Sequence, residues 1–279
     1  MIPLKDNVPS RTTPFVNYLA ITICCVVFLI QAADRTGLIT LQYGLVPARI
    51  SDPQREIQVE RVVVVQTAMG LQQAVVSTPL PPAPIPAWGT LLSCVFLHGS
   101  LMHLLGNMWF LYIFGDNVED RLGHLGYLVF FPACGVAASI VHFGFQPDST
   151  MPTIGASGAV AGVMGAYLLL YPHAMVLSVV PILFFVQILV IPAPIFLGLW
   201  FVMQLMMGTF SVGDTAAAGV AWWAHVGGFV AGLAATSILL WKGSTRPAVT
   251  VVRPGSDRIT AYRLRTRSPW SRHGGGSPE

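Results

Sequence analysis

Charged residues are missing from two long stretches of the chain, and this feature restricts the fold most. Residues 62–115 and residues 149–213 contain no Asp, Glu, Lys or Arg. In the whole chain 54% of residues are hydrophobic and 10% are charged, whereas an average soluble domain has about 25% charged residues. A membrane-spanning helix needs about 20 predominantly apolar residues, and both stretches have room for such helices. The chain is therefore predicted to be an all-α integral membrane protein that crosses the membrane several times.

Six segments are predicted to form membrane-spanning helices. They cover residues 14–33, 97–114, 125–145, 157–171, 193–208 and 221–241. The first segment is long enough to span and has no signal-peptide cleavage site, so we expect it to be retained. The apolar residues 181–192 are too short to cross, because Pro192 and Pro194 interrupt them. They are expected to form an interfacial or re-entrant segment.

Three other regions complete the predicted organisation. Residues 1–13 form the N-terminus, residues 34–96 a long outer loop, and residues 242–279 a basic tail. The loop contains the charged patch SDPQREIQVER and the proline-rich PLPPAPIPA, which argue against a further span, while VVVVQTAMGLQQAVV is predicted to lie along the membrane surface. The composition of the tail is typical of disorder and of contact with anionic lipid. No nucleic-acid binding is expected, because no folded basic module accompanies the tail.

The positions of lysine and arginine indicate the orientation. If both termini are cytoplasmic, eleven of the fifteen Lys and Arg residues lie on that side. Cytoplasmic segments of membrane proteins carry an excess of these residues. We therefore expect both termini to be cytoplasmic, in a bacterial plasma membrane.

In this orientation, four polar residues lie at one depth in the membrane. The second, fourth and sixth segments all begin at the outer surface. His103 and Asn107 share a face near the start of the second segment, Ser157 opens the fourth, and His225 lies about one turn into the sixth. An ionisable residue within a membrane is costly to bury and needs a partner. The common depth therefore indicates a functional site.

Small residues lie on the faces that would bring the fourth and sixth helices together. On the fourth helix they follow Ser157, and on the sixth they fall within about 60° of His225. They include Gly158, Gly162, Gly228 and Gly232. Small residues let membrane helices approach closely, and a hydrogen bond between Ser157 and His225 would require such an approach. Taken alone, however, the pattern G-x-S-G is more typical of a packing face. Each histidine taken alone could have a structural role, forming a hydrogen bond between two helices.

The residue types at this depth are those of nucleophilic catalysis. A neutral histidine within about 3 Å of a serine can take the hydroxyl proton. No Asp or Glu occurs in residues 149–213 or 215–256, so a serine–histidine dyad is predicted, with the histidine oriented by something other than an acid. A metal site at His103 and His225 would lack a third strong ligand, and no cofactor is expected.

Three motifs together carry a family resemblance. HGSLMHLLGN at residues 98–107, GASG at 155–158 and AHVGGFVAG at 224–232 occur in this order on the predicted helices. The combination resembles the rhomboid intramembrane serine proteases over residues 89–241. The resemblance implies a six-helix bundle whose fourth helix is short and central. It also implies that Ser157 is the nucleophile and His225 the general base, and that His103, Asn107 and the Ser157 backbone N–H line the oxyanion site. The supporting residues would be His98, Gly155, Gly158, Gly162, Gly228 and Gly232.

The sequence departs from the family pattern at two places. Many rhomboids carry an Arg after a Trp in the first loop, whereas AWGTLLS here has no Arg near Trp88. Many also carry an aromatic residue one turn after the serine, packed against the catalytic histidine, and here that position is Ala161. Either His225 is held less firmly, or a neighbouring side chain fills the gap.

The predicted function is endoproteolysis of transmembrane or juxtamembrane segments of single-span membrane proteins. Helical peptide bonds are protected by their hydrogen bonds, so segments with Gly, Ala, Ser or Pro should be preferred. Pro192, Pro194 and the loop SVGDTAAAG suggest that the fifth segment gates access to the site. The alternatives are a catalytically silent rhomboid-like protein that binds client helices, and a transporter, although the chain lacks the repeat symmetry expected of a transporter.

Overall fold

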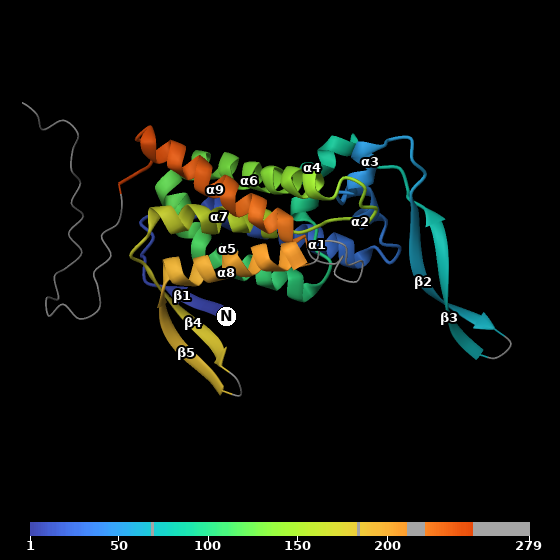
Figure 1. Ribbon diagram of the computed structural model, residues 1–279, viewed down its shortest axis with the longest axis horizontal. Coiled ribbons are helices and arrows are strands. Elements are labelled where there is room, and N and C mark those ends of the chain that lie inside the picture. The colour runs from blue at the N-terminus through green and yellow to red at the C-terminus, as the bar shows by residue number, and fades with distance from the viewer. Residues whose placement is uncertain (68–69, 183–184, 211–220, 248–279) are drawn as a thin grey trace, which may run out of the picture.

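Helices dominate the structure. The computed structural model describes residues 1–67, 70–182, 185–210 and 221–247 (Figure 1). Its longer helices are α1 (Phe15–Ala33), α5 (Leu101–Leu122), α6 (His124–Phe145), α7 (Ser157–Leu170), α8 (Ala193–Phe210) and α9 (Trp222–Trp241). Short helices before α5 are α2 (Leu38–Tyr43), α3 (Pro47–Ser51), η1 (Ala87–Gly89), α4 (Thr90–Ser93) and η2 (Cys94–Phe96). The SVGDTAAAG loop and most of the basic tail lie outside the described residues.

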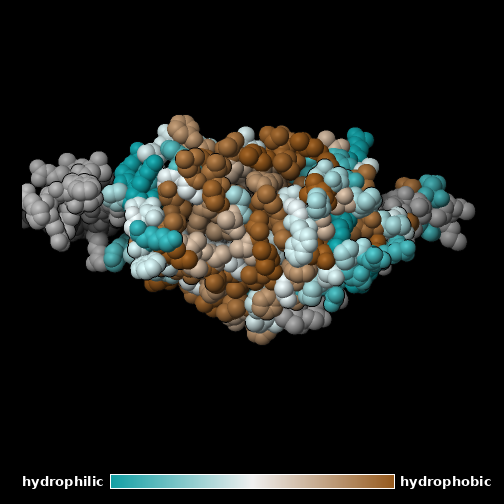
Figure 2. Space-filling view, turned by 90° about the horizontal axis from the view of Figure 1, so that it is seen from above, coloured by the Kyte–Doolittle hydropathy of each residue, from teal (hydrophilic) through white to brown (hydrophobic). Residues whose placement is uncertain are grey.

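The helices have the length and composition of membrane spans. Among the described residues, α1, α6, α8 and α9 are each long and apolar enough to cross a membrane. A fifth crossing results if Ala87–Phe96 and α5, which meet at a bend of 79°, are counted as one span. The helix α7 is apolar but has only 14 residues. The molecular surface agrees, because hydrophobic residues cover its middle and hydrophilic residues gather toward both ends (Figure 2). The prediction of a multi-pass integral membrane protein is confirmed.

The helix α5 differs most from its predicted limits of 97–114. It begins later because Ser100 caps it, accepting a hydrogen bond from the backbone N–H of His103 at 3.1 Å. It also continues past the first charged residues, since these have partners. Glu119 accepts the backbone N–H groups of Val16 and Asn17 at 3.1 and 2.7 Å. Buried charges are tolerated when they are paired or hydrogen-bonded, so the helix extends to Leu122.

A three-stranded antiparallel sheet corrects the all-α prediction. Its strands are β1 (Ile2–Asp6), β4 (Met175–Ile182) and β5 (Phe185–Pro192), in the order β1-β4-β5. The N-terminal residues are therefore partly a strand, and the described residues among 181–192 belong to the paired strands β4 and β5. Asp6 anchors β1 by accepting hydrogen bonds from Asn117 Nδ2 at 2.8 Å and from the Tyr167 hydroxyl at 2.5 Å. Burial raises the pKa of Asp6 to about 6.

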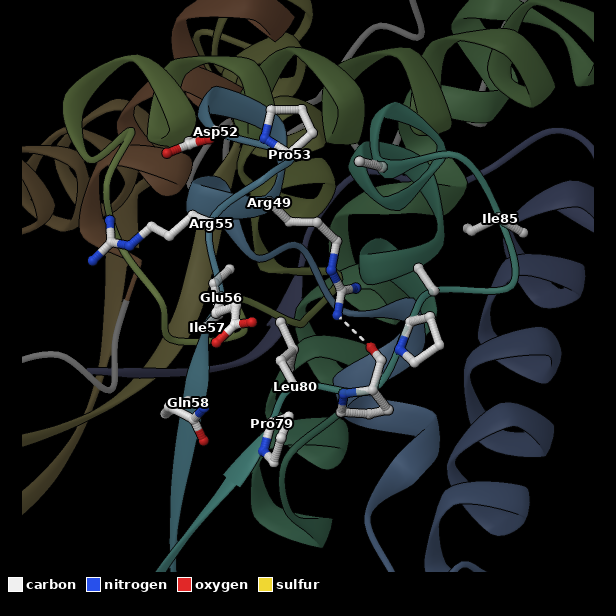
Figure 3. A pocket seen from close by; sticks show the side chains of 14 residues that line it. Arg49, Asp52, Pro53, Arg55, Glu56, Ile57, Gln58, Pro79, Leu80 and Ile85 are labelled. Atoms are coloured by element: carbon white, nitrogen blue, oxygen red, sulfur yellow. Dashed lines mark hydrogen bonds between the residues drawn. The ribbon is translucent and has the colours of Figure 1, made fainter.

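The long loop forms a second sheet, a hairpin at the other end of the bundle (Figure 1). The strands β2 (Gln58–Thr67) and β3 (Gly70–Pro79) pair without interruption from Gln58 opposite Pro79 to Thr67 opposite Gly70. The apolar run predicted to lie along the membrane surface is thus a β-hairpin, consistent with the strand preference of its consecutive valines. A cavity of about 470 Å³ lies at the base of this hairpin (Figure 3). Arg49 closes part of it by donating to the Pro81 carbonyl oxygen at 2.8 Å.

The helix α7 is the most enclosed part of the bundle. Eleven of its 14 residues are buried, and it contacts α5, α6, α8 and α9. The largest fully buried side chains of the described structure include Tyr167 of α7 itself and Phe114, Tyr127, Phe196 and Phe229 on other helices. The first residue of α7 is Ser157, so the candidate nucleophile stands at the entrance to the core of the bundle.

Candidate active site

The loop before Ser157 is tied to the long first loop and to neighbouring helices. Leu45 and Thr153 exchange two backbone hydrogen bonds, at 3.0 and 2.7 Å. The backbone N–H of Gly155 donates to the Cys94 carbonyl oxygen at 2.9 Å. The Thr153 hydroxyl also lies 2.9 Å from His142 Nε2 on α6. These bonds hold the start of α7 in one position. The parts played by Thr153 and His142 were not predicted from the sequence.

Gly155 provides the space in which His103 approaches the serine. Its φ of +132° lies in a region that residues with a side chain rarely adopt. A Cβ atom at this position would lie 2.7 Å from His103 Cε1 and 3.6 Å from Ser157 Oγ. The His103 ring and the Ser157 hydroxyl therefore face the same small space beside the loop. Any larger residue at position 155 would displace the ring.

A hydrogen bond joins the serine of α7 to the histidine of α9. The distance from Ser157 Oγ to His225 Nε2 is 2.7 Å, within the range for direct proton transfer between the two groups. Ser157 is the first residue of α7, and His225 lies in the first turn of α9. Both side chains are partly buried. The geometry allows the proton of the serine hydroxyl to pass to the imidazole.

Backbone contact between α7 and α9 makes this short bond feasible. A Cβ atom at Gly228 would collide with the carbonyl oxygen of Gly158, and one at Gly232 with the carbonyl oxygen of Gly162. The two helices therefore touch through main-chain atoms at two levels just below the Ser157–His225 pair. The four glycines that the sequence placed on facing sides occupy these contacts.

A residue that the sequence analysis missed completes the surroundings of His225. Gln204 Oε1 on α8 lies 2.7 Å from His225 Nδ1, and the Gln204 side chain is only 3% exposed. The Trp200 ring, also on α8, has its centroid 6.0 Å from that of His225. The aromatic neighbour absent at Ala161 is thus supplied by another helix. Gln204 could have been found from the sequence, because it is a single carboxamide in the apolar sequence of α8, four residues after a tryptophan.

Asn107 and His98 are buried polar residues with unused hydrogen-bonding groups. Asn107 is 7% exposed, and its Nδ2 has no hydrogen-bond partner among the described residues. Both ring nitrogens of His98 are likewise without a partner there. The His98 ring packs against His103, with centroids 5.2 Å apart, while its backbone N–H donates to Gln31 Oε1 at 2.9 Å. Since a buried donor without an acceptor is costly, Asn107 Nδ2 is suited to bind an incoming oxygen.

Fold and site together define a multi-pass membrane protein with a serine–histidine pair among its helices. The family model for the rhomboid domain matches residues 86–242. The chain therefore belongs to the rhomboid family. The matched region contains the helices α5 to α9 and every candidate site residue.

Similar proteins are found in bacteria and in plants. The chain is 38% identical over 78 residues to Rhomboid-like protein 11, chloroplastic, of Arabidopsis thaliana, covering 28% of each protein. It is 38% identical over 81 residues to Rhomboid protease GluP of Bacillus subtilis (strain 168), covering 29% of this chain and 15% of GluP. Putative rhomboid protease YdcA of the same bacterium is 31% identical over 81 residues, covering 29% of this chain and 40% of YdcA. The chain thus matches less than half the length of each relative. Because one relative is chloroplastic, the expected bacterial plasma membrane is not supported by these similarities.

Proposed function

We propose that this protein is an intramembrane serine endopeptidase that cleaves transmembrane or juxtamembrane segments of single-span membrane proteins. The observation that carries the proposal is the 2.7 Å hydrogen bond between Ser157 Oγ and His225 Nε2, which joins two helices inside an apolar bundle. Membership of a family that includes the protease GluP supports it. In this proposal Ser157 is the nucleophile and His225 the general base.

The two residues suffice for acyl transfer in two stages. His225 Nε2 accepts the proton of Ser157 as Oγ attacks the carbonyl carbon of the scissile peptide bond. The protonated imidazole then donates that proton to the nitrogen of the leaving amine, and an acyl-enzyme remains. In the second stage His225 takes a proton from water, the resulting hydroxide attacks the ester, and the proton returns to Ser157 Oγ.

Three donors are available for the negative charge that develops on the carbonyl oxygen. Ser157 is the first residue of α7, where backbone N–H groups have no acceptor within the helix. Asn107 Nδ2 is a buried donor that has no partner among the described residues, and the His103 ring lies beside Gly155. We propose that these three groups bind the oxyanion. Such donors are effective because they are oriented before the charge forms.

The Asn107→Ala variant should lower kcat by about a hundredfold to a thousandfold, the usual effect of removing one oxyanion donor. KM should change little, because the bond strengthens mainly in the transition state. The measurement is the cleavage of a purified single-span reporter at several substrate concentrations. A matched control is Asn117→Ala, since Asn117 lies on the same helix and donates to Asp6 at the opposite end. If both variants had the same kcat as the wild type, Asn107 would not bind the oxyanion.

The proposed membrane arrangement has six spans, with residues 14–241 as the membrane domain. The enclosed helix α7 would be the short central span, and Ala87–Phe96 with α5 would form the second. We propose that both termini and the basic tail from residue 242 lie on the cytoplasmic side, because most Lys and Arg residues then lie there. Ser157 and the first loop with its β2–β3 hairpin would face the opposite side.

This arrangement restricts the substrates. A site at the start of α7 reaches the outer part of another protein's transmembrane helix or the residues next to it. A peptide bond becomes accessible only where the helix unwinds, so segments containing Gly or Pro should be cleaved in preference to leucine-rich ones. Water would reach the acyl-enzyme from the side of the first loop.

Cleavage of a panel of single-span reporter proteins tests the proposal. The wild type should cleave at least one reporter, and Ser157→Ala in the same membranes should cleave none above background. The matched control Ser237→Ala changes an exposed serine of α9 that donates to the Leu233 carbonyl oxygen, and it should retain full activity. Equal cleavage by wild type and Ser157→Ala would refute the assignment of the nucleophile. Reporters that bind but are not cleaved by the wild type would instead indicate a silent, client-binding rhomboid.

A further inference from the structure

The helix α8 places one polar side chain in the interior of the bundle. Its outer face is apolar and exposed, and this face includes Ile195, Leu199, Val202, Met203 and Met206. Gln204 points the other way and is 3% exposed. A carboxamide within a membrane bundle requires a hydrogen-bonding partner. That partner is His225, on the side of the ring opposite Ser157.

The bond from Gln204 determines which nitrogen of His225 carries the proton. A carboxamide oxygen has no proton to donate, so a bond between Gln204 Oε1 and His225 Nδ1 requires the proton to be on Nδ1. In a neutral imidazole the other nitrogen, Nε2, then has a free lone pair. This lone pair faces Ser157 Oγ at 2.7 Å. The opposite tautomer could not accept the serine proton.

A neutral partner suits this location better than a carboxylate. The residues from 149 to 213, which include all of α7 and α8, contain no charged side chain. Placing a carboxylate here would require the removal of its water of hydration, which costs far more than burying an amide. The carboxamide can still accept the Nδ1 proton after His225 becomes charged. It can thus orient both forms of the histidine during the reaction.

The same helix also limits the rotation of the ring. Trp200 lies four residues before Gln204 and therefore on the same face of α8. Its ring centroid is 6.0 Å from His225, and Trp222 meets the ring edge-on at 6.1 Å. Two side chains of α8 thus contact the histidine of α9.

We infer that Gln204 is a positioning residue that orients His225 and holds it in the tautomer able to accept the Ser157 proton, a role that rests on the proposed function. Since Gln204 belongs to α8, the base is correctly oriented only while α8 is packed against α9. Gln204 thereby takes the structural place of the acid in a serine–histidine–acid triad.

Three variants test this role in the full-length protein. Gln204→Met keeps a similar length without an acceptor for Nδ1. Gln204→Glu keeps an acceptor oxygen and, when its carboxyl group is protonated, remains neutral like the amide. Met203→Leu is the control on the exposed face of α8. The measurements are kcat and KM on a cleaved reporter, the rate of Ser157 labelling by a fluorophosphonate, and Tm. We expect Gln204→Met to lower kcat and the labelling rate by about tenfold to a hundredfold. KM should stay within about twofold, because Gln204 does not face the substrate.

The conservative variant separates positioning from a merely structural role. The labelling rate of Gln204→Glu should be at least tenfold higher than that of Gln204→Met. If Gln204 were needed only for packing, the two variants would show no such difference. If Gln204→Met did not fold, Gln204→Leu would replace it in the same comparison. Labelling of Gln204→Met at the rate of Met203→Leu would overturn the inference and leave the proposed function intact, because the wild type would still cleave and Ser157→Ala would not. A wild type that neither cleaved nor reacted with the fluorophosphonate would overturn both.

Discussion

The His225→Ala variant is expected to cleave about ten thousandfold to a millionfold more slowly than the wild type. This loss is close to the effect of removing the nucleophile itself. Without the imidazole, Ser157 Oγ loses the base to which it is hydrogen-bonded, and a serine hydroxyl is a weak nucleophile while it keeps its proton. The residual rate would come from oxyanion binding alone. Loss of fluorophosphonate labelling should accompany the loss of cleavage, because both reactions begin with the same attack by Ser157.

A second histidine provides the matched control for this prediction. His173 follows α7 and is exposed, so His173→Ala should cleave and react with the fluorophosphonate like the wild type. The measurements are single-turnover cleavage of a reporter and the rate of labelling. Combining the two changes, Ser157→Ala with His225→Ala, should cost little more than either alone, since the residues act as a unit. Substantial activity of His225→Ala, within about tenfold of His173→Ala, would show that His225 is not the base.

Long apolar segments allowed most of the helices to be predicted. The limits of α1, α6 and α9 differ from the predicted ones by a single residue. The prediction failed where tertiary partners decide the structure. The chain after Phe114 stays helical because Glu119 is satisfied by the backbone N–H groups of Val16 and Asn17, more than 100 positions away. No local pattern reveals such a partner.

The strands were missed for a different reason. Residues 181–192 are apolar on both faces, and β5 leaves most of them exposed. A continuous apolar run has no period by which a strand can be distinguished from a membrane segment. The strand β5 pairs with β4, and β4 in turn pairs with β1, 170 or more residues earlier in the chain, so distant pairing decides the outcome. The valine-rich run of β2 was ambiguous in the same way, although its β-branched residues favoured a strand.

Part of the candidate site could be predicted from the sequence. Ser157 and His225 could be paired because both lie near the start of their helices, with glycines on facing sides. Gln204 lies at the middle of the site, yet it comes from the far part of α8, away from the helix starts that shared a depth with Ser157. Its position depends on how α8 packs against α9, which the sequence does not specify. One polar residue in an apolar helix was a signal that the chain offered, and the prediction that something other than an acid orients the histidine agrees with it.

The Gly228→Ala variant is expected to reduce both activity and stability, although it adds only one methyl group. The added Cβ would collide with the carbonyl oxygen of Gly158, a backbone atom that cannot rotate away. The helices α7 and α9 would have to separate, at a cost of about 1 to 3 kcal/mol typical of overpacking. Ser157 precedes Gly158 directly and His225 lies one turn before Gly228, so the separation would lengthen their hydrogen bond. A displacement of about 1 Å at a reacting group can cost about a hundredfold in rate.

Two other glycines make the comparison specific. Apart from its chain neighbours and the backbone of its own helix, a Cβ atom at Gly144 on α6 or at Gly198 on α8 would meet no described atom within 4 Å. Because alanine favours helices over glycine by roughly 0.5 to 1 kcal/mol, Gly144→Ala and Gly198→Ala should be as stable as the wild type or more so. Thermal unfolding in detergent and reporter cleavage measure the three variants side by side. If Gly228→Ala behaved like these two controls, contact between the α7 and α9 backbones would not be what keeps Ser157 and His225 within hydrogen-bonding distance.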